Sequence, residues 1–321
     1  MTAAERIQHA TAPTDVFGNI VDEETLKSTY RKLAAQVHPD HNPGMDPHVF
    51  AKLNELHEIA RRSFKPFKPF TISIKSRSYT CTRLVATGDI SDVYEAGDKA
   101  VKIVANPRDN DLMENEAKVL HDLYPTKQPS EKFYRYLPRF VETFKVNGRC
   151  VTVFERIADL VTLEDVHRTY PALDYRDAVW MFKRILASTG FAHTKGVVHG
   201  GLVPSNVLVH PIDHGAKIVG WCNANNIRSI SPSYKSFYPS EAKGKITSAT
   251  DIFMAAKIFV FMVGDKLPDR IQRFTSALLL NNPARRPSDA WALHEELDEI
   301  LLQVVGKPKY RPLHMPKDTW R

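Results

Sequence analysis

The spacing of apolar residues changes near residue 70, and this change limits the fold of the chain more than any other feature. In residues 23–37 apolar side chains recur at steps of three and four, as on one face of a helix. In residues 79–106 apolar and polar residues alternate, as in three short antiparallel strands, with turn signals at Gly88 and Gly97–Asp98. A chain of 321 residues is also long enough for two or three domains. We therefore expect a helical N-terminal domain followed by a domain of different class.

Two predicted helices flank a short loop in the N-terminal region. Asp22 is the expected N-cap of the first helix, and Asp46 followed by Pro47 is the expected start of the second, over residues 46–63. Two prolines and a glycine in HPDHNPG, residues 38–44, separate them. The apolar stripes that should pack together are Leu26, Tyr30, Leu33 and Val37 on the first helix, and Phe50, Leu53, Leu56 or His57, and Ile59–Ala60 on the second.

This region resembles a J-domain, the co-chaperone module that engages DnaK-type chaperones. The resemblance covers about residues 13–63 and rests on YRKLAAQVHPDHNP, residues 30–43, followed by a helix with F-x-x-L-N-E. The usual Tyr-rich first helix is reduced here to an Ala-rich stretch around residues 2–10 plus DVFG. The alternative is a helical hairpin with a charged outer face. The resemblance implies these chaperone-binding residues: His38, Pro39, Asp40, Lys27, Arg31 and Lys32.

The formal net charge of +7 is concentrated in two segments. Residues 64–78 contain four basic residues and no acid, and the K-P-F repeat at 65–69 predicts a stiff, extended linker. Residues 306–321 form a basic tail with five basic residues and one acid. We interpret both segments as solvated connectors. Binding of nucleic acid or an acidic partner is the alternative, although no nucleic-acid-binding pattern of aromatic and basic residues is present.

The segment LVATGDISDVYEAGDKAVK, residues 84–102, resembles the start of a protein kinase. Only Gly88 remains of the three loop glycines, since Ala86 and Ser91 hold the other two places. The resemblance implies that Val93 covers the adenine of a nucleotide and that Lys102 pairs with its phosphates. Glu116, in a predicted helix over 112–123, is the expected partner of this lysine, with Glu114 as the fallback.

A second kinase-like pattern follows a predicted strand at 150–157, a short helix near 162–170 and a long helix at 174–196. VVHGGLVPSNVLVH, residues 197–210, resembles the catalytic loop HGDLxxxNVLV: His199 and Asn206 match, and the position of the catalytic base is Gly201. In AKIVGWCNA, residues 216–224, the position of the metal-binding aspartate is Gly220. Asn206 is therefore a further candidate nucleotide-binding residue, while both catalytic aspartates are missing.

No nearby carboxylate is expected to replace these two aspartates. Between Asp177 and Glu241 the only acid is Asp213, which is predicted to lie in a turn between two short strands. Magnesium usually binds through one or two carboxylates, and general-base catalysis contributes roughly 10²–10⁴-fold. We therefore expect no metal site, little phosphoryl transfer and, as a ligand implied by the resemblance, ATP with or without magnesium.

The C-terminal part keeps the structural residues of the kinase pattern. SFYPSEAKG, residues 236–244, resembles the A-P-E element through Glu241, and residues 248–265 resemble the following helix through Asp251. NPARRPSDAWAL, residues 282–293, resembles N-P-x-x-R-P-S, and its Arg286 is expected to form an ion pair with Glu241. Together with His199, these residues should maintain the fold.

These patterns predict a multidomain protein with an all-α J-domain hairpin and an α+β, two-lobed, protein-kinase-like domain. The expected domains are 1–63 (J-domain), 64–78 (linker), 79–157 (small lobe), 158–305 (large lobe) and 306–321 (tail). The main functional prediction is a co-chaperone that stimulates a DnaK-type chaperone and uses an inactive kinase-like domain to bind a client or partner. The alternatives are a weakly active atypical kinase or nucleotide-binding phosphotransferase, and a basic nucleic-acid or assembly interaction protein.

The sequence also predicts a cytoplasmic protein. The charged N-terminus lacks the apolar core of a secretory signal, and no run of 18 apolar residues suggests a membrane span. Cys81, Cys150 and Cys222 lie far apart and form no CxxC pair.

Overall fold

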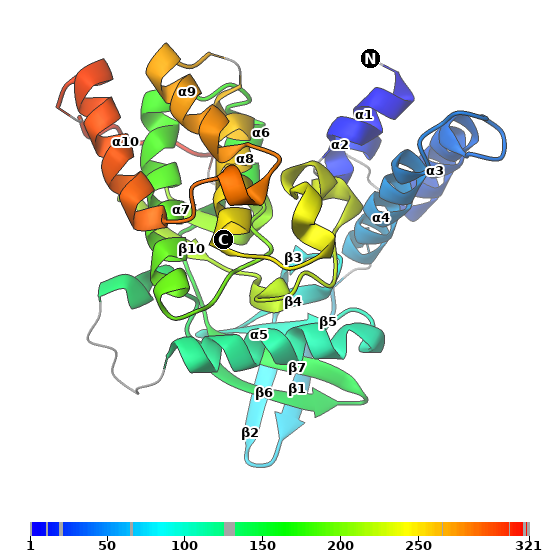
Figure 1. Cartoon of the computed structure of the whole chain (residues 1–321). Coiled ribbons are helices and arrows are strands. Elements are labelled where there is room, and N and C mark those ends of the chain that lie inside the picture. The colour runs from blue at the N-terminus through cyan, green and yellow to red at the C-terminus, as the bar shows by residue number, and fades with distance from the viewer. Residues whose placement is uncertain are drawn as a thin grey trace. The chain divides into compact units, whose positions relative to one another are not determined.

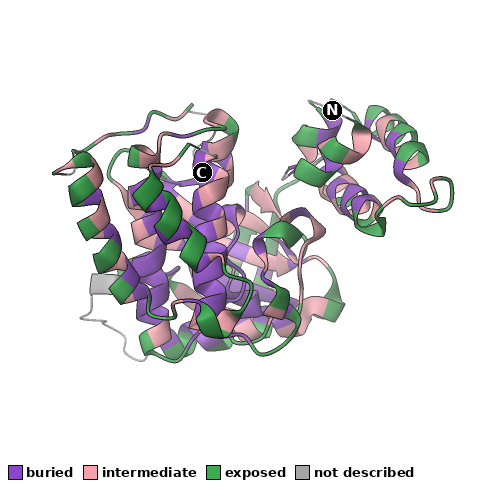
Figure 2. Ribbon diagram, turned by 45° about the horizontal axis from the view of Figure 1, so that its top comes forward, coloured by how far each residue is buried: buried purple, intermediate pink, exposed green. Residues whose placement is uncertain are grey.

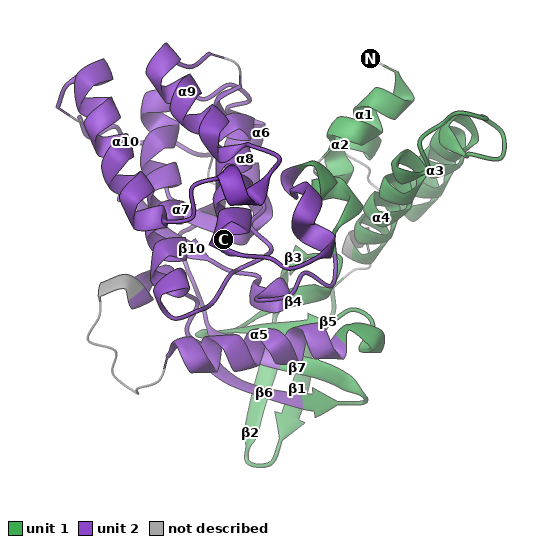
Figure 3. Ribbon diagram, in the orientation of Figure 1, with its two compact units in different colours: residues 1–109, 145–151, 230–236 green, residues 110–144, 152–229, 237–321 purple. Residues whose placement is uncertain are grey.

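The chain folds into two compact units, shown with their elements in Figure 1 and coloured separately in Figure 3. Unit 1 comprises residues 1–109, 145–151 and 230–236, and unit 2 comprises residues 110–144, 152–229 and 237–321. The structure is a computed structural model that describes residues 2–10, 12–18, 22–64, 67–124, 132–264, 266–307, 309–316 and 319. Parts of the predicted linker (65–66) and of the predicted tail (308, 317–318 and 320–321) lie outside the described residues.

Unit 1 begins with four helices: α1 (Ala3–His9), α2 (Pro13–Phe17), α3 (Glu23–Val37) and α4 (Pro47–Phe64). The two helices expected from the sequence are confirmed as α3 and α4. The Asp22 carboxylate accepts a hydrogen bond of 2.7 Å from the Thr25 amide and caps α3. Asp46 accepts one of 2.9 Å from the His48 amide at the start of α4. These caps satisfy amide groups that the first turn of a helix leaves unpaired.

The four helices share one apolar core, visible in Figure 2 as buried purple faces opposite exposed green ones. Ile7 of α1 and Phe17 of α2 are buried in it, so the shortened N-terminal stretch still packs. The predicted stripe on α4 needs a small correction, because Val49 rather than Phe50 is fully buried. The buried members are Ile7, Ala10, Val16, Phe17, Leu26, Leu33, Val37, Val49, Leu53, Leu56 and Ala60.

The prediction of a linker over residues 64–78 is wrong for its second half. Residues 70–81 form an antiparallel hairpin of β1 (Phe70–Ile74) and β2 (Arg77–Cys81), with Phe70 opposite Cys81. Apolar and β-branched residues alternate with polar ones in this segment, which is a strand pattern. The turn contains Lys75 with a positive φ of 52°. Lys75 and Arg77, two of the four basic residues of the predicted linker, thus lie in a hairpin whose Ile72 is buried.

The three strands expected between residues 79 and 106 are confirmed. β3 (Arg83–Thr87), β4 (Ser91–Ala96) and β5 (Lys99–Val104) pair antiparallel, with turns at Gly88 and at Gly97–Asp98. They belong to a five-stranded sheet with the order β3-β4-β5-β7-β6, completed by β6 (Phe140–Val146) and β7 (Arg149–Glu155). Successive side chains of β4 and β5 therefore point to opposite faces of this sheet.

Unit 2 is mainly helical, and its longest helices are buried along much of their length. The core contains α7 (Tyr175–Thr194) and α8 (Ser248–Val263), which pack against each other. β9 (Val207–His210) and β10 (Gly215–Ile218) come at the end of the predicted catalytic loop and after it. They form a small antiparallel sheet with β8 (Val161–Thr162), which precedes α7 in the chain. The remaining α-helices are α5 (Asn110–Leu123), α6 (Leu163–Thr169), α9 (Asp269–Leu278) and α10 (Ala290–Val305).

The prediction that the chain has no membrane span can be compared with the helices of the structure. Within the part of the chain that the structure describes, none of them combines the length and the apolar character needed to cross a bilayer.

Candidate active site

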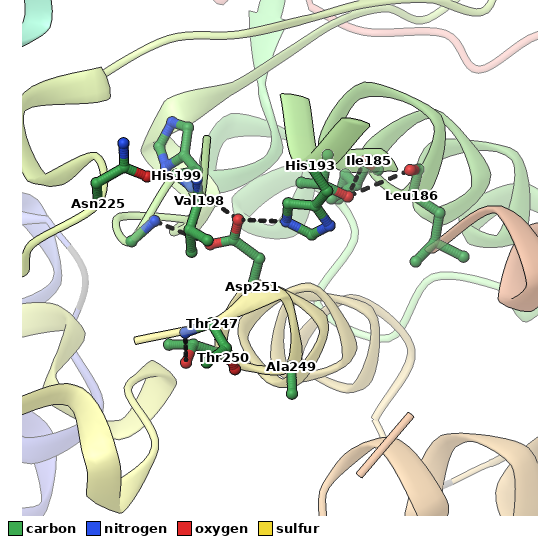
Figure 4. A network of polar contacts seen from close by, with 12 residues as sticks. Ile185, Leu186, His193, Val198, His199, Asn225, Thr247, Ala249, Thr250 and Asp251 are labelled. Carbon is green, nitrogen blue, oxygen red and sulfur yellow. Dashed lines mark hydrogen bonds and ion pairs between the residues drawn. The ribbon is translucent and has the colours of Figure 1, made fainter. Parts of the chain in front are cut away.

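The loop between α7 and β9 is held by one buried carboxylate of α8. Asp251, fully buried, accepts hydrogen bonds from the amides of His199 (2.7 Å) and Gly200 (2.8 Å). His193 at the end of α7 lies 2.9 Å from the same carboxylate through its Nε2 atom. Figure 4 shows His193 at the end of α7 and His199 of the loop, both in contact with the Asp251 carboxylate of α8. A buried carboxylate with several donors is fixed in position, because losing any donor would leave charge unpaired.

His199 is a structural residue of this loop. Its ring is buried, its Nδ1 atom accepts a hydrogen bond of 3.1 Å from the Gly201 amide, and its Nε2 atom lies 3.1 Å from the Val219 carbonyl. These contacts assign the proton to Nε2, so the ring is neutral. Burial lowers the pKa of His199, which keeps the ring in this form near neutral pH. The side chain thereby connects residue 201 with the residue before Gly220.

The structure brings Gly201, Asn206 and Gly220 together. The Asn206 amide donates a hydrogen bond of 2.9 Å to the Gly201 carbonyl. Gly220 has a φ of +78°, and a Cβ atom added there would lie 2.6 Å from the Asn206 side chain. At Gly201 an added Cβ would meet its nearest atoms at 3.5 Å or more, which is ordinary contact. Asn206 thus occupies the space in which a side chain at position 220 would begin, whereas position 201 has room for one.

Helix α5 supports the segment that contains Gly220. The Glu116 carboxylate accepts a hydrogen bond of 3.0 Å from the Trp221 amide, and its residue is only 1% exposed. Asn115 donates to the carbonyls of Cys222 (3.0 Å) and Ala224 (3.1 Å). Glu114, the fallback for the lysine partner, is exposed. The inward carboxylate of this helix is therefore that of Glu116.

The ion pair expected in the C-terminal part is present. Nη1 of Arg286 lies 2.7 Å from Oε1 of Glu241, and the arginine side chain is fully buried. The same nitrogen donates a hydrogen bond of 2.8 Å to the Ala249 carbonyl, and Nη2 of the guanidinium donates one to the Leu280 carbonyl. These bonds connect three segments of unit 2, which fits a structural role.

The remaining nucleotide-binding candidates lie in unit 1. Val93 of β4 and Lys102 of β5 are direct cross-strand partners, so their side chains share one face of the sheet. Gly88 lies in the turn before β4, where its amide donates 2.9 Å to the Ser91 carbonyl. Glu116 and Asn206 belong to unit 2. The pairing of Lys102 with Glu116 accordingly stays a prediction.

The residues predicted to bind a chaperone lie on α3 and the following loop. His38 Nδ1 accepts a bond of 3.2 Å from the Asp40 amide, and its ring packs on Phe50 at 4.5 Å between centroids. Lys27 forms an exposed ion pair of 3.1 Å with Glu23. Arg31 and Lys32 are exposed, and Pro39 is half-buried. The loop thus has an internal structure of its own, compatible with a hairpin that has a charged outer face.

The site does not fit a magnesium ion held by protein carboxylates. The two positions at which the kinase pattern has aspartates are Gly201 and Gly220. Asp213 lies in the turn between β9 and β10, and its side chain is exposed. Asn206 offers only a neutral oxygen, while magnesium prefers carboxylates. Among the described residues, no group of three or more His, Cys, Asp or Glu side chains could hold a metal ion.

Known proteins similar to this chain include serine/threonine-protein kinases. Serine/threonine-protein kinase D of Synechocystis is 21% identical over 212 residues, which are 61% of this chain and 37% of that protein. Serine/threonine-protein kinase PknD of Chlamydia muridarum is 27% identical over 150 residues, 41% of this chain and 15% of that protein. The chain thus spans well under half the length of both relatives. A solved kinase domain superposes with a TM-score of 0.54 at 13% identity, covering 68% of this chain and 94% of that domain.

The fold is protein-kinase-like. No family model matches the chain. The superposition shows a likeness in fold alone.

The main function predicted from the sequence, a J-domain co-chaperone, is therefore wrong. The similar proteins are kinases, and they favour the alternative of an atypical kinase or nucleotide-binding phosphotransferase. The physical reason for the error is the small size of the pattern. An HPD tripeptide between two amphipathic helices describes a helical hairpin, and side chains of α4 contact other segments of unit 1.

Sequence reasoning missed contacts made by α4 within unit 1. Glu55 binds Ser231 and Ser233, Lys52 binds the Ser233 carbonyl, and Arg62 pairs with Asp92. No local spacing connects residues that lie 30 to 181 positions apart. The one available signal is the presence of Lys52 and Glu55 beside the apolar stripe of α4, where charged side chains need partners.

Proposed function

We propose that the kinase-like part of the chain binds a nucleoside triphosphate and acts as a weak, atypical phosphotransferase. The observation that carries this proposal is the anchoring of the loop at residues 199–201 by Asp251. A buried carboxylate and a buried neutral histidine keep the loop in one conformation although neither catalytic aspartate is present. Phosphoryl transfer depends mainly on positioning and electrostatic stabilisation, so a preserved frame is the part of the machinery most worth testing.

The same geometry sets the expected rate. A positioned general base contributes roughly 10²–10⁴-fold, and Gly201 has no side chain that could act as one. Asn206 binds the Gly201 carbonyl through its amide nitrogen, and its oxygen is neutral. Lys102 and Val93, neighbours on one sheet face, are the residues proposed to contact the phosphates and the base. Binding should depend little on a protein-held metal, because the carboxylates that would hold it are missing.

Nucleotide binding is tested first, by the thermal stability of the full chain with increasing ATP in magnesium or in EDTA. A ligand at 100 times its Kd stabilises a protein by about 2.7 kcal/mol. We expect similar shifts in both buffers, and a shift reduced by Lys102→Ala. Lys99→Ala is the matched control, since Lys99 lies on the same strand and pairs with Asp98 at the turn.

Transfer is tested with γ-labelled ATP and the Gly201→Asp variant. A Cβ atom at position 201 makes only ordinary contacts, so we expect this variant to fold and to raise the labelling rate at least about tenfold. Lys102→Ala in the Gly201→Asp background should remove the gain. ATP that fails to stabilise the chain, together with labelling that neither substitution changes, would refute the proposed function.

A further inference from the structure

Helix α4 binds a segment that lies far away in the sequence. The Glu55 carboxylate accepts hydrogen bonds from the Ser231 hydroxyl, from the Ser233 amide at 3.0 Å and from the Ser233 hydroxyl at 2.8 Å. Lys52, one turn earlier, donates to the Ser233 carbonyl at 3.2 Å and to the Gln8 carbonyl at 2.9 Å. The helix and residues 230–236 belong to the same unit, as the shared colour in Figure 3 shows. Two ionisable side chains thus hold one short segment.

These contacts are buried or partly buried, unlike an ordinary surface ion pair. Lys52 is 5% exposed and Glu55 is half-buried. Burial raises the pKa of Glu55, and the bonds from Ser231 and Ser233 oppose this shift. Exposed pairs contribute little, whereas a buried charge that loses its hydrogen bonds is costly. The segment is therefore held by directional bonds whose loss should be measurable.

The C-terminal end of the same helix holds a second loop. Arg62 Nη1 lies 3.2 Å from the Asp92 carboxylate, and Nη2 donates to the Gly88 carbonyl. The arginine and aspartate side chains are only 23% and 16% exposed. Gly88 and Asp92 lie on either side of the tip of the β3–β4 turn, which is the candidate phosphate-binding loop. One rigid helix thus connects this turn to residues 231–233.

We propose that α4 is an intramolecular brace of unit 1 in which Arg62 is a positioning residue for the nucleotide-binding candidates of that unit. Glu55 holds residues 231–233, which lie in the chain between Gly220 and Glu241, and Arg62 holds the turn at Gly88. A loop fixed before the ligand arrives loses less conformational entropy on binding, so the brace raises nucleotide affinity. This role rests on the proposed function, while the bracing contacts themselves can be measured without a nucleotide.

The contacts are tested by amide hydrogen exchange of the full chain. The Ser233 amide donates to Glu55, and a hydrogen bond to a charged group is strong, so Glu55→Gln should speed its exchange roughly tenfold. Glu58→Gln is the matched control on the same helix, because Glu58 is exposed and pairs with Arg61. Unchanged exchange at residues 231–233 in Glu55→Gln would overturn the brace.

The effect on the site is tested by the Kd for ATP. Arg62→Met should weaken binding about three- to tenfold, and Arg62→Lys should restore part of the affinity because it keeps the charge without the planar fork. Arg61→Met, a change of an exposed neighbour, should leave the Kd unchanged. Equal or tighter binding by Arg62→Met would overturn the positioning role. Absence of ATP binding by the unaltered chain, with exchange still accelerated in Glu55→Gln, would instead refute the proposed function and leave the bracing contacts established.

Discussion

Lys52 should have an unusually low pKa because it is buried against two carbonyl groups. Burial lowers its pKa to about 8 from the ordinary lysine value of 10.5, although the charges of Glu55 and Asp15 act in the opposite direction. In the unfolded chain the amine would titrate at its ordinary value. Between these two values the folded state binds fewer protons than the unfolded state, so stability must rise with pH in that window. One pKa unit corresponds to about 1.4 kcal/mol, and the whole shift to about 3 kcal/mol.

The perturbation that isolates this group is Lys52→Met, which removes the charge and keeps much of the volume. Between about pH 7 and pH 9.5 the unaltered chain should gain about 2 kcal/mol over the variant in the free energy of unfolding. The variant also leaves the Gln8 and Ser233 carbonyls without this donor, a pH-independent loss of about 1–3 kcal/mol. The pH dependence of the difference in the free energy of unfolding, rather than its pH-independent part, therefore measures the effect of the buried charge.

The direct assay is a carbon-13 NMR titration of chains labelled at lysine Cε. The resonance absent from Lys52→Met identifies the side chain, and its midpoint should lie near the value given above, while exposed lysines titrate near about 10.4. Pulse proteolysis at both pH values gives the stability difference. A Lys52 resonance that titrates with the exposed lysines, or a stability difference independent of pH, would refute the reasoning from burial.

Three further experiments test the frame of the candidate site. Gly220→Ala should lower the melting temperature, because the φ of +78° and the clash of the added methyl group cost about 1–3 kcal/mol of strain. Gly201→Ala should leave the melting temperature nearly unchanged. Equal effects of the two substitutions would contradict the geometry. Asp251→Ala should cost about 3–5 kcal/mol in urea denaturation, since three donors lose a buried acceptor. A double-mutant cycle of Arg286→Met and Glu241→Gln should give about 1–3 kcal/mol of coupling, and zero coupling would exclude a stabilising pair.

Much of the local structure could be predicted from the spacing of residues. The limits of α3 and α4 follow from apolar periodicity and from carboxylate caps at Asp22 and Asp46, and both signals act within a few residues. The proximity of Gly201 and Gly220 was predictable for a related reason. Gly201 precedes β9 and Gly220 follows β10, and the short hairpin of these two strands brings the two glycines together. The linker prediction failed where basic residues were given more weight than the strand alternation around Ile72.

The local sequence patterns thus predict the helices and strands, their order along the chain and the absence of both catalytic aspartates. Each of these features depends on residues that are close neighbours in the chain. The contacts of α4 with residues 231–233 and with the β3–β4 turn come from folding alone. They join residues that are 26 to 181 positions apart, and nothing in the local spacing around Glu55, Lys52 or Arg62 indicates their partners. Burial next to apolar residues requires such charges to find hydrogen bonds, while the folded chain selects which groups provide them.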